Sequence, residues 1–125
     1  MRLLIDTNAL LWIVGNPRQL SAAARSALEE PTNERFLSMA SLWEIAIKVS
    51  VGKLSIPMSL DAAVAYAAST PLTISVAHAK RVQALPFHHR DPFDRMMIAQ
   101  AMEEGLTIVT RDRIFSAYGV PVLTA

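Results

Sequence analysis

The sequence predicts an α/β fold in which helices cover both faces of a parallel sheet. Short apolar runs of strand length alternate along the chain with longer segments that carry helix caps and helix-forming residues. The first run, residues 3–5, is continuously apolar, as is typical of a strand buried on both faces. With 125 residues, of which 52% are hydrophobic, the chain is expected to fold as a single domain over residues 1–125.

The first half of the chain contains two predicted strands and four predicted helices. Ser21 and Ser59 are suited to begin two of the helices, because a serine hydroxyl accepts a hydrogen bond from a free amide of the first turn. Ser41 is expected to open another helix, and Gly52 lies just beyond its end. The expected strands cover 3–5 and 35–39, and the expected helices cover 7–14, 22–30, 41–50 and 60–69.

The second half continues the alternation of strands and helices. Asp91 is expected to cap a long helix, Pro92 suits its first turn and Gly105 ends it. The histidine-containing segment over 87–90 is expected to be a loop. The expected strands cover 72–75, 106–110 and 121–124, and the expected helices cover 76–85 and 92–104.

Composition and charge exclude several classes of protein. The chain has no cysteine, which rules out disulfides and thiolate metal sites and favours a cytoplasmic location. No segment reaches the ~18 apolar residues of a membrane span, so no membrane association is expected. The net charge of +1 does not indicate nucleic-acid binding, so any contact with a polyanion must depend on local positive charge.

Four acidic side chains fall where predicted strands end or predicted helices begin. Asp6 ends the first strand, and Asp112 comes just after the strand over 106–110. Glu44 and Asp94 lie in the first turns of two predicted helices. In such a fold the carboxyl ends of strands and the amino ends of helices share one edge of the sheet, where ligands bind. We therefore expect the four carboxylates to meet.

Carboxylates that meet repel one another and raise their own pKa values, and a divalent cation relieves this. Mg²⁺ and Mn²⁺ prefer oxygen ligands, and Mg²⁺ commonly shares its coordination shell with water and substrate phosphates. Such a site is suited to hydrolysis of a phosphodiester, with one metal ion or two. The acidic residues therefore predict a hydrolase that depends on Mg²⁺ or Mn²⁺.

Each acid also has a structural interpretation that the sequence leaves open. Asp6 and Asp112 can cap the helices that follow them, and Asp91 is first of all a cap. Glu44 can form a capping box with Ser41, or an ion pair with Lys48 four residues later. The predicted metal site would be absent only if all of these acids had such structural roles and no other.

Four segments combine the acidic residues with characteristic neighbours: LLIDTNALLW, SLWEIAIK, HRDPFDRMMIAQA and TIVTRD. They resemble the signature segments of the PIN-domain ribonucleases, and specifically the VapC-like toxins of type II toxin–antitoxin systems. The resemblance implies a three-layer α/β/α domain with a parallel sheet of four or five strands. It also implies an endoribonuclease dependent on Mg²⁺ or Mn²⁺, a homodimer, and a cognate antitoxin protein as partner.

Site residues can be carried over from the resemblance by motif. It implies that Asp6, Glu44, Asp94 and Asp112 are the catalytic and metal-binding acids. The polar residues expected around them are Thr7, Asn8, Asp91 and Thr110.

Basic and aromatic residues complete the predicted site. Arg90, Arg95 and Arg111 are expected to position RNA, although Arg95 could instead pair with a nearby Asp. His88 and His89 could approach RNA from their loop but are left outside the predicted metal site. The remaining large side chains are expected to be structural: His78 as a surface residue, and Trp12 and Trp43 as core or dimer contacts.

Taken together, the sequence predicts a metal-dependent endoribonuclease that acts as the toxin of a toxin–antitoxin pair. A signalling receiver domain also places acids at the edge of a parallel sheet, but it requires an Asp at the end of the third strand, where this chain has Thr73, Ile74 and Ser75. A catalytically inactive PIN-like protein that binds RNA or a partner is the remaining alternative.

Overall fold

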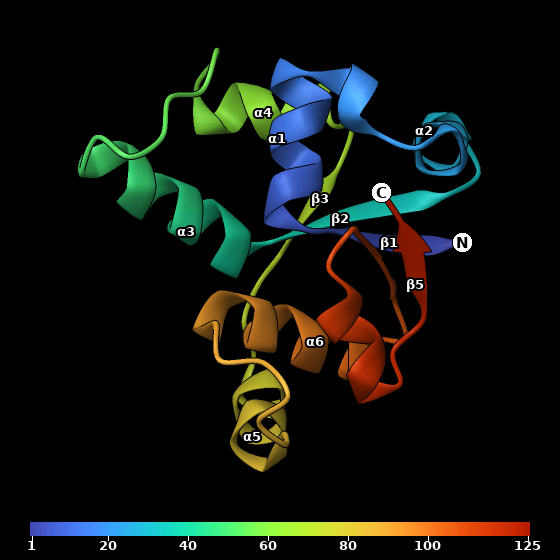
Figure 1. The fold of residues 1–125 in the computed structure, drawn as a ribbon, viewed down its shortest axis with the longest axis vertical. Helices are drawn as coiled ribbons and strands as arrows, with labels where there is room; N and C mark the ends of the chain where they lie inside the picture. Colours follow the sequence, from blue (N-terminus) through green and yellow to red (C-terminus); the bar gives the residue numbers. More distant parts are fainter.

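The computed structural model describes residues 1–125 and contains a five-stranded parallel sheet. The strands follow the order β3-β2-β1-β4-β5, so the first strand of the chain is central. This confirms the predicted α/β fold with a parallel sheet (Figure 1). The strands are β1 (Arg2–Ile5), β2 (Glu34–Ser38), β3 (Thr70–Leu72), β4 (Thr107–Thr110) and β5 (Val122–Thr124).

Six α-helices and two short 3-10 helices connect the strands. Figure 1 shows α1, α3 and α4 on one side of the sheet and α5 and α6 on the other. The α-helices are α1 (Thr7–Gly15), α2 (Ala22–Glu29), α3 (Met39–Ser50), α4 (Leu60–Tyr66), α5 (Val76–Ala84) and α6 (Pro92–Glu104). The 3-10 helices are η1 (Pro17–Gln19) and η2 (Arg113–Tyr118).

Two hydrophobic clusters hold the helices against the sheet. Leu3 and Ile5 of β1 point into the cluster shared with α1, α2 and α3, whereas Leu4 points into the cluster shared with α6 and η2. All three side chains are fully buried. A strand that is apolar at successive positions is therefore needed here, because both of its faces are covered.

Local capping explains where several helices begin and end. The Asp91 carboxylate accepts hydrogen bonds from the first-turn amides of α6, and Pro92 occupies the first helical position, as predicted. Gly105 follows α6 with a φ of 66°, a left-handed conformation that strongly favours glycine. The Ser21 and Ser59 hydroxyls cap α2 and α4 as predicted.

The structure corrects the predicted start of α3. Ser38 caps this helix, which begins at Met39, two residues earlier than the beginning expected at Ser41. Ser41 lies inside the helix, where its hydroxyl is 3.0 Å from the Met97 sulfur. The predicted capping box between Ser41 and Glu44 is therefore wrong, and Glu44 lies in the second turn of the helix.

Two other predictions are wrong. The third strand covers Thr70–Leu72 rather than 72–75, because its backbone pairs with β2 from Phe36 onward. His78 was expected at the surface but is 1% exposed, with its ring between the start of α5 and Glu104 of α6.

None of the helices combines the length and the apolar character that crossing a membrane requires.

Candidate functional site

Five acidic residues from separate parts of the chain line one cleft at the carboxyl edge of the sheet. The cleft has a volume of about 160 Å³. All four acids predicted to meet are among them. The lining residues are Asp6, Thr7, Asn8, Glu44, Lys48, Asp91, Asp94, Asp112 and Phe115.

Asp6 lies between β1 and α1 and has two roles. Its Oδ1 accepts a 2.7 Å hydrogen bond from the Ala9 amide, so it caps α1, and the side chain also lines the cleft. Burial raises the pKa of Asp6 from 3.8 to about 6, against the lowering effect of hydrogen bonds from Thr110 and Ala9. The negative charges of Asp112 and Glu44 raise this pKa further.

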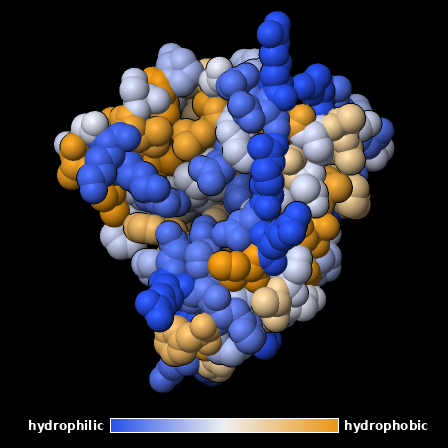
Figure 2. Space-filling model, viewed as in Figure 1, coloured by the Kyte–Doolittle hydropathy of each residue, from blue (hydrophilic) through white to orange (hydrophobic).

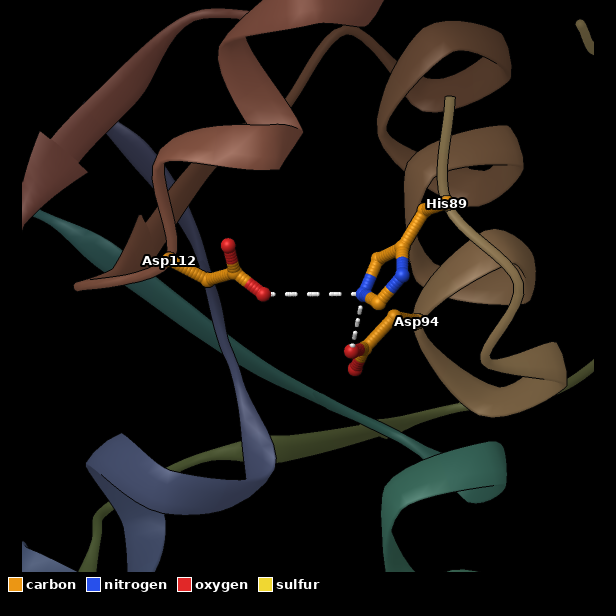
Figure 3. Close-up of side chains that lie close together, drawn as sticks. All are labelled: His89, Asp94 and Asp112. Atoms are coloured by element: carbon orange, nitrogen blue, oxygen red, sulfur yellow. Dashed lines mark hydrogen bonds and ion pairs between the residues drawn. The ribbon is translucent and has the colours of Figure 1, made fainter. Parts of the chain in front are cut away.

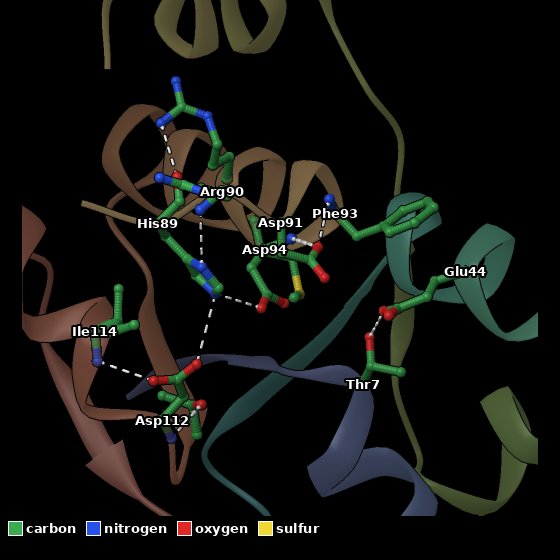
Figure 4. A network of polar contacts seen from close by, with 12 residues as sticks. Thr7, Glu44, His89, Arg90, Asp91, Phe93, Asp94, Asp112 and Ile114 are labelled. Atoms are coloured by element: carbon green, nitrogen blue, oxygen red, sulfur yellow. Dashed lines mark hydrogen bonds and ion pairs between the residues drawn. The ribbon is translucent and has the colours of Figure 1, made fainter. Parts of the chain in front are cut away.

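Each carboxylate oxygen of Glu44 has one hydrogen-bond partner. The Thr7 hydroxyl donates a 2.7 Å hydrogen bond to Glu44 Oε1, as Figure 4 shows. Lys48 Nζ donates to Glu44 Oε2 at 2.9 Å, which is the ion pair predicted one helical turn away. The hydrogen bond to Glu44 raises the pKa of Lys48, so the ammonium group stays charged. Both carboxylate oxygens of Glu44 thus have a fixed orientation.

Asp91 and Asp94 occupy the amino end of α6. Asp91 Oδ1 accepts hydrogen bonds from the amides of Phe93 at 2.9 Å and Asp94 at 3.0 Å. Burial raises the pKa of Asp94 from 3.8 to about 7, and the neighbouring charge of Asp91 adds to the increase. The carboxylate form of Asp94 is therefore costly unless a cation lies nearby.

Asp112 completes the acidic group from the end of β4. Its Oδ1 accepts a 3.0 Å hydrogen bond from the Ile114 amide and caps η2, and its own amide donates to the Thr110 hydroxyl at 3.1 Å. Its side chain is 41% exposed, which makes it the acid most open to solvent in this group. For Asp6, Asp91 and Asp112, capping a helix and lining the cleft therefore occur together.

His89 lies directly against these acids, which the sequence analysis did not predict. Its Nε2 is 2.7 Å from Asp94 Oδ2 and 3.5 Å from Asp112 Oδ2 (Figure 3). Ligand atoms of the three side chains lie within 4.8 Å of one another, close enough to share a metal ion. The one available signal was the position of His89 in the loop that leads into α6.

The three arginines expected to contact RNA have different environments. Arg95 is 5% exposed, and its guanidinium donates to backbone carbonyls in the loop before α6 and to the Tyr118 hydroxyl. These donors are therefore occupied inside the protein, which leaves the Arg95 guanidinium little surface for a contact with RNA. The structure contains no ion pair between Arg95 and an Asp.

Arg111 and Arg90 differ in how much of the guanidinium is available. The Arg111 guanidinium donates to the carbonyls of Ala125 and Gln19 and lies 4.2 Å from the centre of the Trp12 ring. Arg90 is exposed, and its side chain makes no hydrogen bond or ion pair in the structure. Arg90 is therefore the predicted RNA-contacting arginine with free donors beside the acids.

The donor set is suited to a hard divalent cation. Five carboxylates and the Thr7 hydroxyl line the cleft, and such oxygen atoms are the ligands that Mg²⁺ and Mn²⁺ prefer. Burial is the main cause of the raised pKa values of Asp6 and Asp94, so the charged form of each carboxylate is unfavourable there and would be stabilised by a bound cation. Figure 2 shows hydrophilic surface across the middle of the face drawn in Figure 1.

The parallel sheet with acidic residues at its carboxyl edge is an α/β fold with a candidate metal site. Comparison with known proteins shows the family to which the chain belongs. The model of the PIN domain matches residues 3–121, and the chain belongs to the PIN-domain family. It is also 30% identical over 126 residues to Ribonuclease VapC22 of Mycobacterium tuberculosis (strain ATCC 25618 / H37Rv), covering 94% of this chain and 92% of that protein. The resemblance to VapC-like PIN-domain ribonucleases is thereby confirmed.

Solved structures support the same fold. VapBC2 of Rickettsia felis, bound to a DNA fragment from its promoter, superposes with a TM-score of 0.72 at 14% identity, covering 98% of each chain. DNA-bound VapBC of Salmonella typhimurium superposes with a TM-score of 0.68 at 18% identity, covering 98% of this chain and 97% of that one. At these identities the likeness concerns the fold.

Proposed function

We propose that this protein is an endoribonuclease that depends on Mg²⁺ or Mn²⁺ and acts as the toxin of a toxin–antitoxin pair. The observation that carries the proposal is the group of carboxylates from four parts of the chain in one cleft, two of them with raised pKa values. Similarity to a ribonuclease along nearly the whole chain supports the choice of RNA over other phosphodiesters.

The proposed metal ligands are Asp6, Glu44, Asp94 and Asp112. Thr7 and Lys48 keep the two oxygens of Glu44 in place, and the caps at Asp6 and Asp112 fix one oxygen of each carboxylate. A bound Mg²⁺ or Mn²⁺ supplies a water of lowered pKa and neutralises charge on the phosphate. Asn8 is exposed at the rim of the cleft and is positioned to contact substrate. The Thr110 hydroxyl accepts a hydrogen bond from the Asp112 amide.

Binding of RNA phosphates requires positively charged side chains near the acids, and the chain has such side chains around the cleft. The free guanidinium of Arg90 is the first candidate, because it follows His89 directly and has no internal partner. Lys48 borders the cleft but is paired with Glu44, so it balances charge there more than it attracts phosphate. Arg111 keeps its predicted role only if it releases its carbonyl partners.

The proposed partners are an antitoxin and a second copy of this chain. The superposed structures are VapBC complexes, which supports a cognate antitoxin. Helix α3 has exposed apolar side chains at every fourth position, and these support association of two copies. The side chains are Met39, Trp43, Ile47 and that of the C-cap residue Val51. Helix α3 itself lies at the left of Figure 1. The proposed RNA substrate agrees with the predicted cytoplasmic location.

The test is cleavage of RNA by the purified protein. With Mg²⁺ or Mn²⁺ the wild-type protein should cut RNA, and a chelator should stop the reaction. Asp6→Asn and Asp94→Asn should abolish both cleavage and growth arrest on expression, whereas Asp61→Asn, an exposed acid of α4, serves as the matched control.

Wild-type cleavage rates in both variants would refute the catalytic assignment. RNA binding that is equally strong in chelator, without cleavage in metal, would favour the inactive RNA-binding alternative.

A further inference from the structure

We propose that His89 is a positioning residue of the metal site, and that its Nε2–H holds the carboxylates of Asp94 and Asp112 in the orientation that binds the ion. This role rests on the proposed function, because it presupposes that these acids bind metal. It adds to the acidic group a residue from the loop between α5 and α6, a segment that contributes none of the four acids.

The hydrogen bonds of the ring determine which nitrogen carries the proton. Nδ1 of His89 accepts a 3.1 Å hydrogen bond from the Arg90 amide, so Nδ1 carries no proton. The proton of the neutral ring is therefore on Nε2, which faces Asp94 Oδ2 at 2.7 Å and Asp112 Oδ2 at 3.5 Å. An N–H in this position donates to Asp94, lies near Asp112 at the longer distance, and has no lone pair with which to bind a metal ion.

This proton placement favours positioning over direct ligation. In many metal sites, a residue outside the ligand shell hydrogen-bonds a ligand and fixes its orientation. With Asp94 Oδ2 bound to His89, the second oxygen of Asp94 remains free for the ion. Asp112 is held at Oδ1 by the Ile114 amide, and its Oδ2 lies 3.5 Å from His89 Nε2, so the imidazole faces the oxygen that the cap leaves free.

The position of His89 is itself determined by a buried network. The His89 amide donates to the Tyr118 hydroxyl at 2.9 Å, and the ring packs edge-on against Phe115 with 6.0 Å between centroids. Tyr118 and Arg95 both donate to the Pro86 carbonyl at 2.8 Å. This explains why Arg95 is buried: it holds the loop that presents His89 to the acids.

The first experiment compares two replacements that fill similar space. His89→Gln keeps an N–H donor near the position of Nε2, whereas His89→Met removes the donor. Binding of Mn²⁺ is measured by titration calorimetry, after circular dichroism has shown that each variant is folded. We expect His89→Met to weaken binding about 10- to 100-fold and His89→Gln to recover most of the loss. His88→Ala, the exposed neighbour, should bind as the wild type does.

The second readout is the electron spin echo spectrum of bound Mn²⁺, which detects a directly coordinated imidazole nitrogen. We expect no such nitrogen. Its presence would overturn the proposal in favour of a histidine ligand, and equal Mn²⁺ affinity of wild type and His89→Met would overturn it in favour of no role. A wild-type protein that does not bind Mn²⁺ would refute the proposed function itself, whereas these two outcomes refute the role of His89 alone.

Discussion

Replacing Asp6 by Asn should make the metal-free protein more stable while it removes a metal ligand. The Asp6 side chain is 6% exposed, and burial is the main cause of its raised pKa. Asparagine keeps an oxygen that can accept the Ala9 amide, so the cap of α1 is retained. Its amide hydrogens would face Asp112 and Glu44, whose charges oppose ionisation of Asp6.

The size of the effect follows from the pKa. Each pKa unit is worth about 1.4 kcal/mol, so an increase from 3.8 to about 6 corresponds to about 3 kcal/mol of lost stability in the charged state. The folded state binds the proton more tightly than the unfolded chain. The contribution of Asp6 to stability is therefore greatest below about pH 4, falls between about pH 4 and pH 6, and does not change above that range. We expect Asp6→Asn to gain about 1–3 kcal/mol at pH 8 and nothing at pH 4.

The assay is urea unfolding in chelator at pH 4, 6 and 8, with Asp61→Asn as the control on an exposed helix end. Saturating Mg²⁺ should then stabilise the wild type more than Asp6→Asn, because binding to the folded state adds to its stability. The reasoning fails if Asp6→Asn is less stable than the wild type at pH 8, or if the difference does not change with pH.

Four further predictions concern other parts of the molecule. Arg95→Met should lower the free energy of unfolding by about 2–4 kcal/mol because it leaves buried carbonyls without donors, and unchanged urea unfolding would contradict this. Arg90→Ala should reduce the slope of log affinity for RNA against log salt by about 1, and an unchanged slope would remove Arg90 from the contact surface. Mn²⁺ should raise the melting temperature of the wild type but not that of Asp94→Asn, and equal increases would argue against Asp94 as a ligand. Val51→Glu should shift the protein toward monomer in light scattering, whereas an unchanged mass would exclude this part of α3 from a dimer interface.

Features decided by neighbouring residues could be predicted from the sequence. The beginning and end of α6 follow from Asp91, Pro92 and Gly105, because capping involves hydrogen bonds within one turn. The ion pair of Glu44 with Lys48 is local in the same way. Burial of β1 on both faces could also be predicted, since an uninterrupted apolar strand is stable only when both faces are covered.

Features decided by contacts between distant segments of the chain could not be predicted from the sequence. The third strand is shifted because it pairs with β2, and Pro71 is accepted there because β3 is at the edge of the sheet. Ser38 was expected to lie inside a strand and Ser41 to begin α3, whereas β2 ends at Ser38 and the Ser38 hydroxyl caps the helix. The burial of His78 depends on Glu104 and Gln100, more than twenty residues away.

The same distinction between local sequence and tertiary packing applies to the candidate site. The order of strands and helices in the chain was enough to predict that Asp6, Glu44, Asp94 and Asp112 meet, because a parallel sheet brings strand ends and helix starts to one edge. Tertiary packing decided that His89 lies against Asp94 and Asp112, and that the Arg95 side chain is buried. Both depend on the loop before α6, whose path is set by the Tyr118 hydroxyl and the buried guanidinium, and no local pattern records that contact.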